Sequence, residues 1–111
     1  MAEELKIIDS LWVLKTSDGY KIGLRNEAQE DLGTITFATM PKVGQSLQKG
    51  DSLIELEAEK AVSEFSTPIS GTIVAINEAV EQDTSVLDDA DQTNAWIAIL
   101  KDVDEAELNQ A

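Results

Sequence analysis

The chain has 111 residues, with 22 acidic and 8 basic side chains and a formal net charge of −14 at pH 7. This balance argues against nucleic acid and anionic membrane surfaces as partners, because both require a positively charged footprint. The chain contains no cysteine and no histidine, which excludes disulfides and thiolate metal sites and removes the commonest general base. We therefore expect a protein that is not an enzyme.

The length predicts a single domain over residues 1–111, which can bury about two thirds of its unfolded surface. No apolar run approaches the roughly 20 residues of a membrane span. Residues 1–4, Met-Ala-Glu-Glu, are acidic with no apolar core and show neither a signal nor a transit peptide, so we expect a cytoplasmic protein. Charged residues along the predicted strand edges favour a monomer.

The first third of the chain predicts a β-hairpin followed by a helix. Residues 10–16 and 20–24 are rich in apolar side chains and are joined by a Ser-Asp-Gly turn, a pattern typical of paired strands. Asn26 is a favourable N-cap, and Gln29 can reach back to it in a capping box. Gly33 then predicts a left-handed end of the helix.

The middle of the chain predicts strands. Residues 34–38 alternate polar and apolar side chains, which indicates a half-buried strand, and residues 45–47 predict a brief pairing. Residues 52–59 alternate as well, with Leu53, Glu55, Glu57 and Glu59 expected on one face. Residues 72–76 are apolar on both faces and predict an interior strand.

The last third predicts a polar loop, a strand and a helix. Asp83 or Thr84 predicts the start of a short helix through about Leu87, within the acidic stretch 77–94. The carboxylates there lack the spacing of a calcium loop, so we interpret the stretch as a solvated loop. Residues 95–100 predict a final strand, and residues 102–108 predict a short C-terminal helix.

Lys60 is the candidate functional residue. It lies between the predicted strands 52–59 and 72–76, in a segment that contains the turn formers Ser66, Pro68, Ser70 and Gly71. A lysine at the exposed tip of a hairpin presents its amine on a flexible stem, where a modifying enzyme can acylate it. The alternative is an ordinary solvated lysine, and the surrounding residues decide between the two.

Those residues resemble the lipoyl-lysine segment of the glycine cleavage system H protein family. The family has a Glu three residues before the modified lysine, an Ala directly after it and a Ser three residues after it. This chain has Glu57, Lys60, Ala61 and Ser63 in the same order. The family's Ser-Pro-x-Ser-Gly turn follows here as Thr-Pro-Ile-Ser-Gly, with Thr67 as the one change.

Two upstream segments carry the same resemblance. Residues 23–33 are similar to the family's Gly-Ile-Thr-x-x-Ala-Gln-x-x-Leu-Gly segment, and residues 41–44 match its Pro-x-Val-Gly turn. The resemblance extends from about residue 12 to residue 77. It implies a mainly β protein with a barrel-sandwich hybrid fold, the flattened barrel of lipoyl and biotinyl domains. A short helix is expected after the first hairpin and another at the C-terminus.

The resemblance also implies the cofactor and its site. Lipoate would be joined covalently to Lys60, and the recognition frame of the hairpin would comprise Glu57, Glu59, Ala61, Ser63 and Gly71. Biotin carriers have a similar architecture, but their lysine usually lies between two methionines, whereas its neighbours here are Glu59 and Ala61. Lipoyl is therefore favoured over biotinyl. An unmodified protein-binding module is the alternative from another class.

Some segments differ from the family pattern. The His-Glu-Trp triplet of the first strand is Ser10-Leu11-Trp12 here, and Arg25 replaces a threonine. Near the end, residues 89–96 retain an Asp and Trp96 of the family's Asp-Pro-Tyr-Gly-x-Gly-Trp segment. In the family, these regions shelter the arm or meet partner enzymes.

We therefore favour, by a small margin, an H-like lipoyl carrier that works outside glycine breakdown. The alternative is the H protein of the glycine cleavage system, which carries an aminomethyl group between glycine decarboxylase and aminomethyltransferase. The expected partners are a lipoate ligase or lipoyl transferase, together with glycine cleavage enzymes or other enzymes that use lipoate. ADP-ribosylation enzymes are a further expected partner of an H-like protein.

Overall fold

The computed structural model describes residues 5–8, 11–17, 19–88 and 94–103. The strands are β1 (Leu5–Ile8), β2 (Leu11–Thr16), β3 (Gly19–Leu24), β4 (Ile35–Thr39), β5 (Ser46–Leu47), β6 (Ser52–Ala58), β7 (Val62–Ser66), β8 (Gly71–Ile76) and β9 (Trp96–Lys101). The helices are α1 (Asn26–Leu32), α2 (Glu78–Gln82) and the 3-10 helix η1 (Thr84–Asp88). None of these helices is long and apolar enough to cross a membrane.

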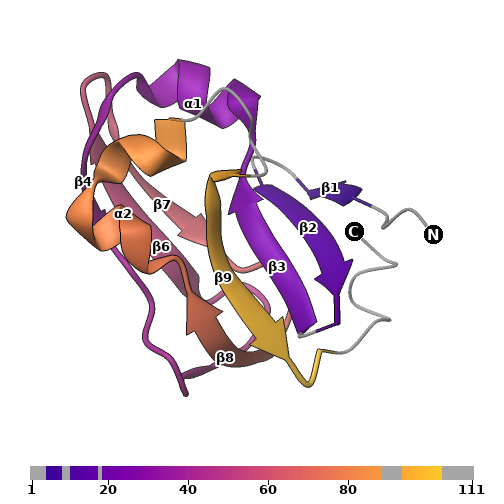
Figure 1. Cartoon of the computed structure of the whole chain (residues 1–111). Coiled ribbons are helices and arrows are strands. Elements are labelled where there is room, and N and C mark those ends of the chain that lie inside the picture. The colour runs from indigo at the N-terminus through magenta and orange to yellow at the C-terminus, as the bar shows by residue number, and fades with distance from the viewer. Residues whose placement is uncertain (1–4, 9–10, 18, 89–93, 104–111) are drawn as a thin grey trace.

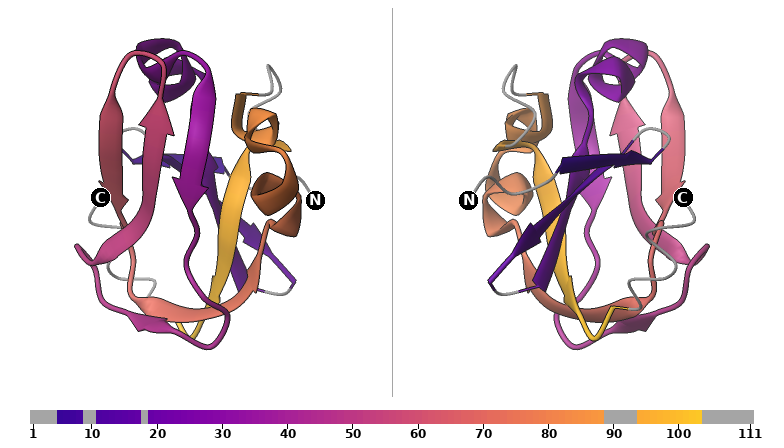
Figure 2. Two further views of the ribbon diagram at one scale, coloured as in Figure 1. Left: turned by 90° about the vertical axis from the view of Figure 1, so that its left-hand side faces the viewer. Right: turned by 90° about the vertical axis from the view of Figure 1, so that its right-hand side faces the viewer.

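Two antiparallel sheets pack face to face, as Figures 1 and 2 show. One sheet has six strands in the order β1-β2-β3-β9-β8-β5, and the other has three in the order β4-β6-β7. The prediction of a mainly β sandwich is therefore confirmed. The six-stranded sheet includes β1, which the sequence analysis did not predict.

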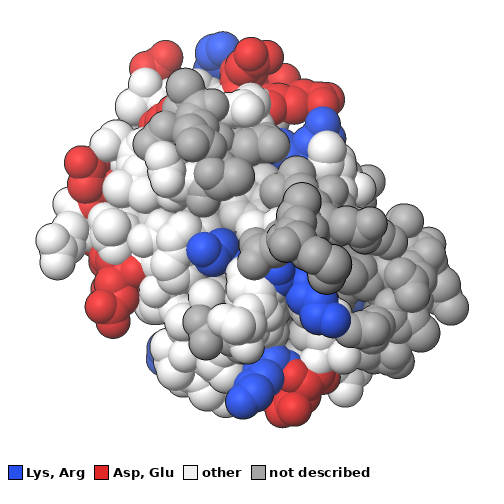
Figure 3. Space-filling view, turned by 45° about the vertical axis from the view of Figure 1, so that its right-hand side comes forward, with Lys and Arg blue, Asp and Glu red and all other residues white. Residues whose placement is uncertain are grey.

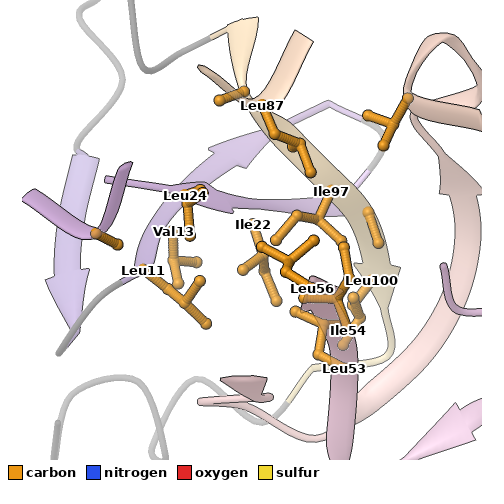
Figure 4. Packing of buried hydrophobic residues seen from close by; sticks show 14 of the residues in the cluster. Leu11, Val13, Ile22, Leu24, Leu53, Ile54, Leu56, Leu87, Ile97 and Leu100 are labelled. Atoms are coloured by element: carbon orange, nitrogen blue, oxygen red, sulfur yellow. The ribbon is translucent and has the colours of Figure 1, made fainter. Parts of the chain in front are cut away.

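The buried apolar side chains lie between the two sheets (Figure 4). Leu11, Val13, Ile22 and Leu24 come from β2 and β3, and they face Leu53, Ile54 and Leu56 of β6 across the sandwich. Ile97 and Leu100 of β9 and Leu87 of η1 complete the labelled cluster. Burial of a side chain of this size stabilises a fold by about 1.5–3 kcal/mol, so this layer holds the two sheets together.

The predicted first hairpin is confirmed, but the predicted capping of the helix is wrong. β2 and β3 pair from Leu11–Leu24 to Thr16–Gly19. Helix α1 begins at Asn26 without a side-chain cap on its backbone. The Asn26 Nδ2 donates to the Gln29 Oε1 at 2.8 Å, so the two side chains meet as expected, but this bond does not cap the backbone as a capping box would. The buried Gln29 also donates from its Nε2 to the Leu87 carbonyl at 2.6 Å and ties α1 to η1. The helix ends before Gly33, as predicted.

Two predictions of strand faces are wrong because the ladders shift register. A shift in the β4–β6 ladder between Ile35 and Phe37 leaves Ile35 buried and Phe37 exposed. A second shift, between Ser52 and Ile54 of β6, buries both Leu53 and Ile54. Leu53 therefore does not share the exposed face of the glutamates on this strand.

The hairpin partner of β6 also differs from the prediction. The partner is β7, not residues 72–76, which lie in β8 of the other sheet. Between β7 and β8, the Thr67 N–H donates to the Asp51 carbonyl at 2.8 Å, and the Gly50 N–H donates to the Thr67 carbonyl at 3.0 Å. Ile69 is fully buried in the core. The Thr-Pro-Ile-Ser segment therefore joins the sheets and fills one end of the sandwich.

The acidic stretch contains more helix than predicted. η1 confirms the helix expected from about Thr84 to Leu87, whereas α2 was not predicted. Hydrogen bonds from the side chain and the backbone N–H of Ser85 lower the pKa of the Asp83 carboxyl. The predicted C-terminal helix lies outside the described residues except for Asp102 and Val103, which are not helical.

Candidate functional site

Lys60 lies at the tip of the β6–β7 hairpin, as predicted. The last strand pair is Glu57–Val62, and the Ala58 N–H donates to the Ala61 carbonyl at 2.9 Å. Glu59 and Lys60 are therefore the two central residues of a tight turn, and both are exposed. Such a turn leaves little freedom in its backbone, so the starting point of the Lys60 side chain is fixed.

Two further backbone hydrogen bonds hold this turn against the connection between α1 and β4. The Glu59 N–H donates to the Thr34 carbonyl at 2.9 Å, and the Lys60 N–H donates to the Leu32 carbonyl at 3.0 Å. The tip of the hairpin and the helix α1 consequently lie side by side at one end of the sandwich (Figure 2). The turn is anchored from both of its own strands and from this connection.

The side chain of Lys60 folds over the end of α1. Its Nζ donates to the Glu30 carbonyl at 3.1 Å. Its stem lies over Gly33, where an added Cβ would come within 3.3 Å of Lys60 Cγ and 3.4 Å of Lys60 Cε. The last turn of α1 has no basic residue of its own. Lys60 thus supplies the positive charge that favours the carboxyl end of a helix.

An open groove of about 660 Å³ lies beside the Lys60 stem. Its lining residues come from α1, the connection that follows it and η1, and they are Asn26, Gln29, Glu30, Gly33, Thr34 and Asp88. Asp88 is fixed in place, since its Oδ2 accepts the Ile35 N–H at 3.0 Å. The Thr84 hydroxyl donates to the Ile35 carbonyl at 2.6 Å and holds the other end of η1 on β4.

Two carboxylates of the acidic stretch accept hydrogen bonds from the chain itself. Asp83 accepts hydrogen bonds from Ser85, and Asp88 accepts the one from Ile35. Asp89 and Asp91 lie outside the described residues. In the part of the chain that the structure describes, no group of three or more His, Cys, Asp or Glu side chains is arranged to hold a metal ion.

The structure brings most of the predicted recognition frame together. Glu57, Glu59 and Ala61 lie exposed at or next to the turn. Ser63 lies on the same hairpin but pairs with Leu56 in a row that faces inward and is only partly exposed. The role of these residues in recognition stays a prediction.

Gly71 does not lie beside the turn. It begins β8 and pairs with Leu47, beyond the end of the hairpin where Ser52 pairs with Ser66. Gly71 does not need the left-handed backbone angle that favours glycine, because the glycines with positive φ are Gly19, Gly33, Gly44 and Gly50. A Cβ on Gly71 would lie 2.8 Å from the Lys101 carbonyl oxygen, so close packing explains the glycine.

The contacts of Lys60 with Glu30, Leu32 and Gly33 were not predicted. Gly33 was interpreted only as the end of a helix, and it lies 27 positions before Lys60 in the sequence. A contact over this separation leaves no periodic pattern in a sequence. The only available signal was that the two segments resembling the H-protein family, 23–33 and 57–71, contain the two halves of this contact.

A lysine at a rigid hairpin tip of a two-sheet sandwich defines the barrel-sandwich class of carrier proteins. A solved glycine cleavage system H protein from Mycobacterium marinum has this fold, superimposes with a TM-score of 0.74 at 26% sequence identity, and is covered over 94% of its length by 96% of this chain. The family model described as "Glycine cleavage H-protein" matches residues 4–111. The chain belongs to the glycine cleavage H-protein family.

Relatives of similar length support this assignment. The glycine cleavage system H protein of Listeria monocytogenes serotype 4a (strain HCC23) is 37% identical over 97 residues, which are 87% of this chain and 78% of the relative. The H protein of Sodalis glossinidius is 37% identical over 100 residues, 89% of this chain and 76% of that protein. Glycine cleavage H-proteins carry a covalently attached lipoate. The predicted family, the barrel-sandwich fold and the lipoate cofactor are therefore confirmed.

Proposed function

We propose that Lys60 is the lipoylated residue and that the protein is the carrier of a glycine cleavage system. The observation that supports this best is the geometry of the Lys60 turn, which presents one exposed amine on a backbone fixed by three hydrogen bonds. The family assignment favours glycine cleavage over the H-like carrier outside glycine breakdown that the sequence analysis preferred. The H-like carrier outside glycine breakdown is thus less well supported than the H protein of the glycine cleavage system.

The surroundings of Lys60 fit a lipoyl group. Lys60 is exposed, and its aliphatic stem lies over Gly33 in space that a side chain at position 33 would fill. When bound, lipoate would supply a reactive disulfide at the end of a long arm, which receives and releases the transported one-carbon unit.

The residues of the chain would position this arm rather than perform chemistry. The turn fixes the Cα of Lys60, and the anchoring to Leu32 and Thr34 fixes the turn relative to the rest of the sandwich. Acylation converts the ammonium into a neutral amide and removes the charge that favours the contact with the Glu30 carbonyl. The stem is then held less firmly on α1 and can extend toward a partner enzyme.

The catalytic groups would come from the partner enzymes. The chain has no histidine and no cysteine, so it lacks the side chains that most often move protons or form covalent intermediates. The partners that this function requires are an enzyme that attaches lipoate and the enzymes of glycine cleavage. The contribution of this protein would be to hold the Lys60 amine in a fixed position.

The test of the attachment site is the intact mass of the protein after incubation with lipoate, ATP and a lipoate ligase. We expect one lipoyl adduct on the wild type and none on Lys60→Arg, which keeps the positive charge but not the reactive amine. An adduct on Lys60→Arg would move the site to another lysine.

The test of the pathway uses the purified lipoylated protein. Mixed with glycine decarboxylase, it should support glycine-dependent exchange of carbon dioxide, and unmodified protein should not. A lipoylated protein that supports no exchange would restore the interpretation as an H-like carrier outside glycine breakdown.

A further inference from the structure

The outer face of the three-stranded sheet carries two rows of side chains directly beside the Lys60 turn. Residues that pair across antiparallel strands share a face, and the register therefore defines each row. One row is formed by Phe37, Glu57 and Val62, and the other by Thr39, Glu55 and Glu64. All six side chains are exposed. We call this surface the outer β4–β6–β7 face.

The row nearest to Lys60 is apolar at both ends. Phe37 is 55% exposed and Val62 is 67% exposed, which places them among the few large apolar side chains that the described surface presents to solvent. Neighbouring strands are about 4.8 Å apart, so this row forms a strip about 10 Å wide with Glu57 at its centre. Two exposed large apolar side chains on either side of a carboxylate offer a partner protein both apolar and charged contacts.

The second row contains an unfavourable pair. Glu55 lies directly opposite Glu64, and like charges in this position destabilise a sheet. Neither these two carboxylates nor that of Glu57 forms an ion pair or hydrogen bond with a side chain in the described part of the protein. The face therefore displays three carboxylates that lack a cation within their own sheet.

Protection of sheet edges does not explain this arrangement. Charges on an edge strand prevent association with other strands, and this role suits Glu64 on β7. Glu55 and Glu57, however, lie on β6, which is paired on both sides by β4 and β7. The two central carboxylates need a different explanation.

The other sheet has the opposite charge. Its strands β2, β3 and β9 contain Lys15, Lys21 and Lys101 and no aspartate or glutamate. Figure 3 shows, among the described residues of this view, Lys and Arg side chains near the middle and Asp and Glu side chains toward the edges. Among the described strands, only β6 and β7 carry carboxylates, so the outer β4–β6–β7 face is the sheet surface that offers them to a cationic partner.

We propose that the outer β4–β6–β7 face is the docking surface for the enzyme that attaches lipoate to Lys60. This inference rests on the proposed function of Lys60. The enzyme would contact Phe37 and Val62 with apolar side chains and would place arginine or lysine over Glu57 and over the Glu55–Glu64 pair. Val62 is only two residues from Lys60, so an enzyme seated here has its active site within reach of Nζ.

The reaction at Nζ is an acyl transfer. The free amine of Lys60 attacks the carbonyl carbon of lipoyl adenylate, the bond from that carbon to the phosphate oxygen breaks, and AMP leaves with the electron pair. The nitrogen loses a proton as the amide forms. Docking on the outer β4–β6–β7 face would bind the carrier before this step. Loss of docking contacts should therefore change the KM for the carrier more than kcat.

The test is a comparison of two variants that each lose two carboxylates. Glu55→Gln/Glu57→Gln changes the docking face on its central strand. Glu78→Gln/Glu81→Gln changes two exposed residues of α2, which lies on the opposite side of the sandwich (Figure 2). Intact mass gives the initial rate of lipoylation at increasing concentrations of each unmodified protein, and thermal unfolding confirms that each one is folded.

We expect the docking-face variant to raise KM about tenfold at low ionic strength and the α2 variant to change it less than about twofold. The difference should shrink at about 1 M salt, where charges are screened within about 3 Å. A third variant, Phe37→Thr/Val62→Thr, should raise KM at every salt concentration, because it removes apolar contacts and retains residues that suit strands.

Equal KM values for the wild type and the docking-face variant would overturn the inference. So would an equal rise in the α2 variant, because it would show attraction by net charge alone. In both cases a single adduct on the wild type and none on Lys60→Arg would leave the proposed carrier function intact. No adduct on the wild type would overturn both.

Discussion

The stem of Lys60 occupies space that exists because residue 33 is a glycine. A Cβ on Gly33 would lie 3.3 Å from Lys60 Cγ, and the backbone of Gly33 has a φ of +75°. Both features disfavour any other residue at this position. The end of α1 and Lys60 are thus two parts of one local structure, joined also by the bond from the Lys60 N–H to the Leu32 carbonyl.

Gly33→Ala should therefore have two separable effects. The positive φ should cost about 1 kcal/mol of folding free energy, and the added methyl group should displace the Lys60 stem. Urea denaturation measures the first effect. The chemical shifts of the Lys60 side chain and its rate of lipoylation measure the second.

Gly50→Ala is the matched control. Gly50 has a φ of +95°, but a Cβ there would meet no atom within 4 Å. This variant should lose a similar amount of stability and leave the shifts of Lys60 unchanged. If the two variants changed the chemical shifts and the lipoylation rate of Lys60 equally, the contact between the Lys60 stem and Gly33 would have no influence on either property.

The sequence predicted those parts of the fold that have a local cause. The hairpin of β2 and β3 follows from apolar segments on either side of a short turn, and the end of α1 follows from Gly33. β7 was missed because none of its side chains is fully buried, so its residues have no apolar signal of their own. This strand exists because β6 offers a pairing edge, which is a tertiary cause.

The site divides in the same way. The position of Lys60 at a turn was predictable from the residues around it and from their resemblance to a family. Its contacts with Glu30 and Gly33, and the exposure of Phe37, depend on how distant segments pack and on a register shift in β4. Neither leaves a pattern in the sequence.

Gln29→Ala should destabilise the protein by about 1–3 kcal/mol. The side chain is buried and donates to the Leu87 carbonyl, so its loss leaves that carbonyl without this partner and opens a small cavity between α1 and η1. Chemical denaturation measures the change. Gln45→Ala, at an exposed position, should change stability by less than about 0.5 kcal/mol. Equal losses in both variants would show that the tie between the helices contributes little.

Gly71→Ala should reduce stability without changing lipoylation of the folded protein. The new methyl group would collide with the Lys101 carbonyl oxygen and crowd Leu100 and Val103, which typically costs about 1–3 kcal/mol. The residue is remote from the Lys60 turn. Thermal unfolding and the rate of lipoylation below the unfolding transition measure the two properties. A slower rate for the folded variant would return Gly71 to the recognition frame that the sequence predicted.

Glu64→Gln should stabilise the protein and at the same time raise the KM of the lipoate-attaching enzyme for it. Removing one charge of the directly opposed pair with Glu55 should raise the free energy of unfolding by about 0.2–1 kcal/mol. The gain should diminish at high salt, because the repulsion is between exposed charges. Glu57→Gln is the control, since Glu57 lies between Phe37 and Val62 and faces no charge in its own row. It should show no comparable gain. If both variants were equally stable, repulsion within the pair would be negligible, and the unfavourable pair would no longer be evidence that these carboxylates serve a partner.

A Glu64→Gln protein that is more stable but has a higher KM for lipoylation would support the docking surface. It would show that Glu64 lowers the stability of the folded protein and strengthens binding of the lipoate-attaching enzyme.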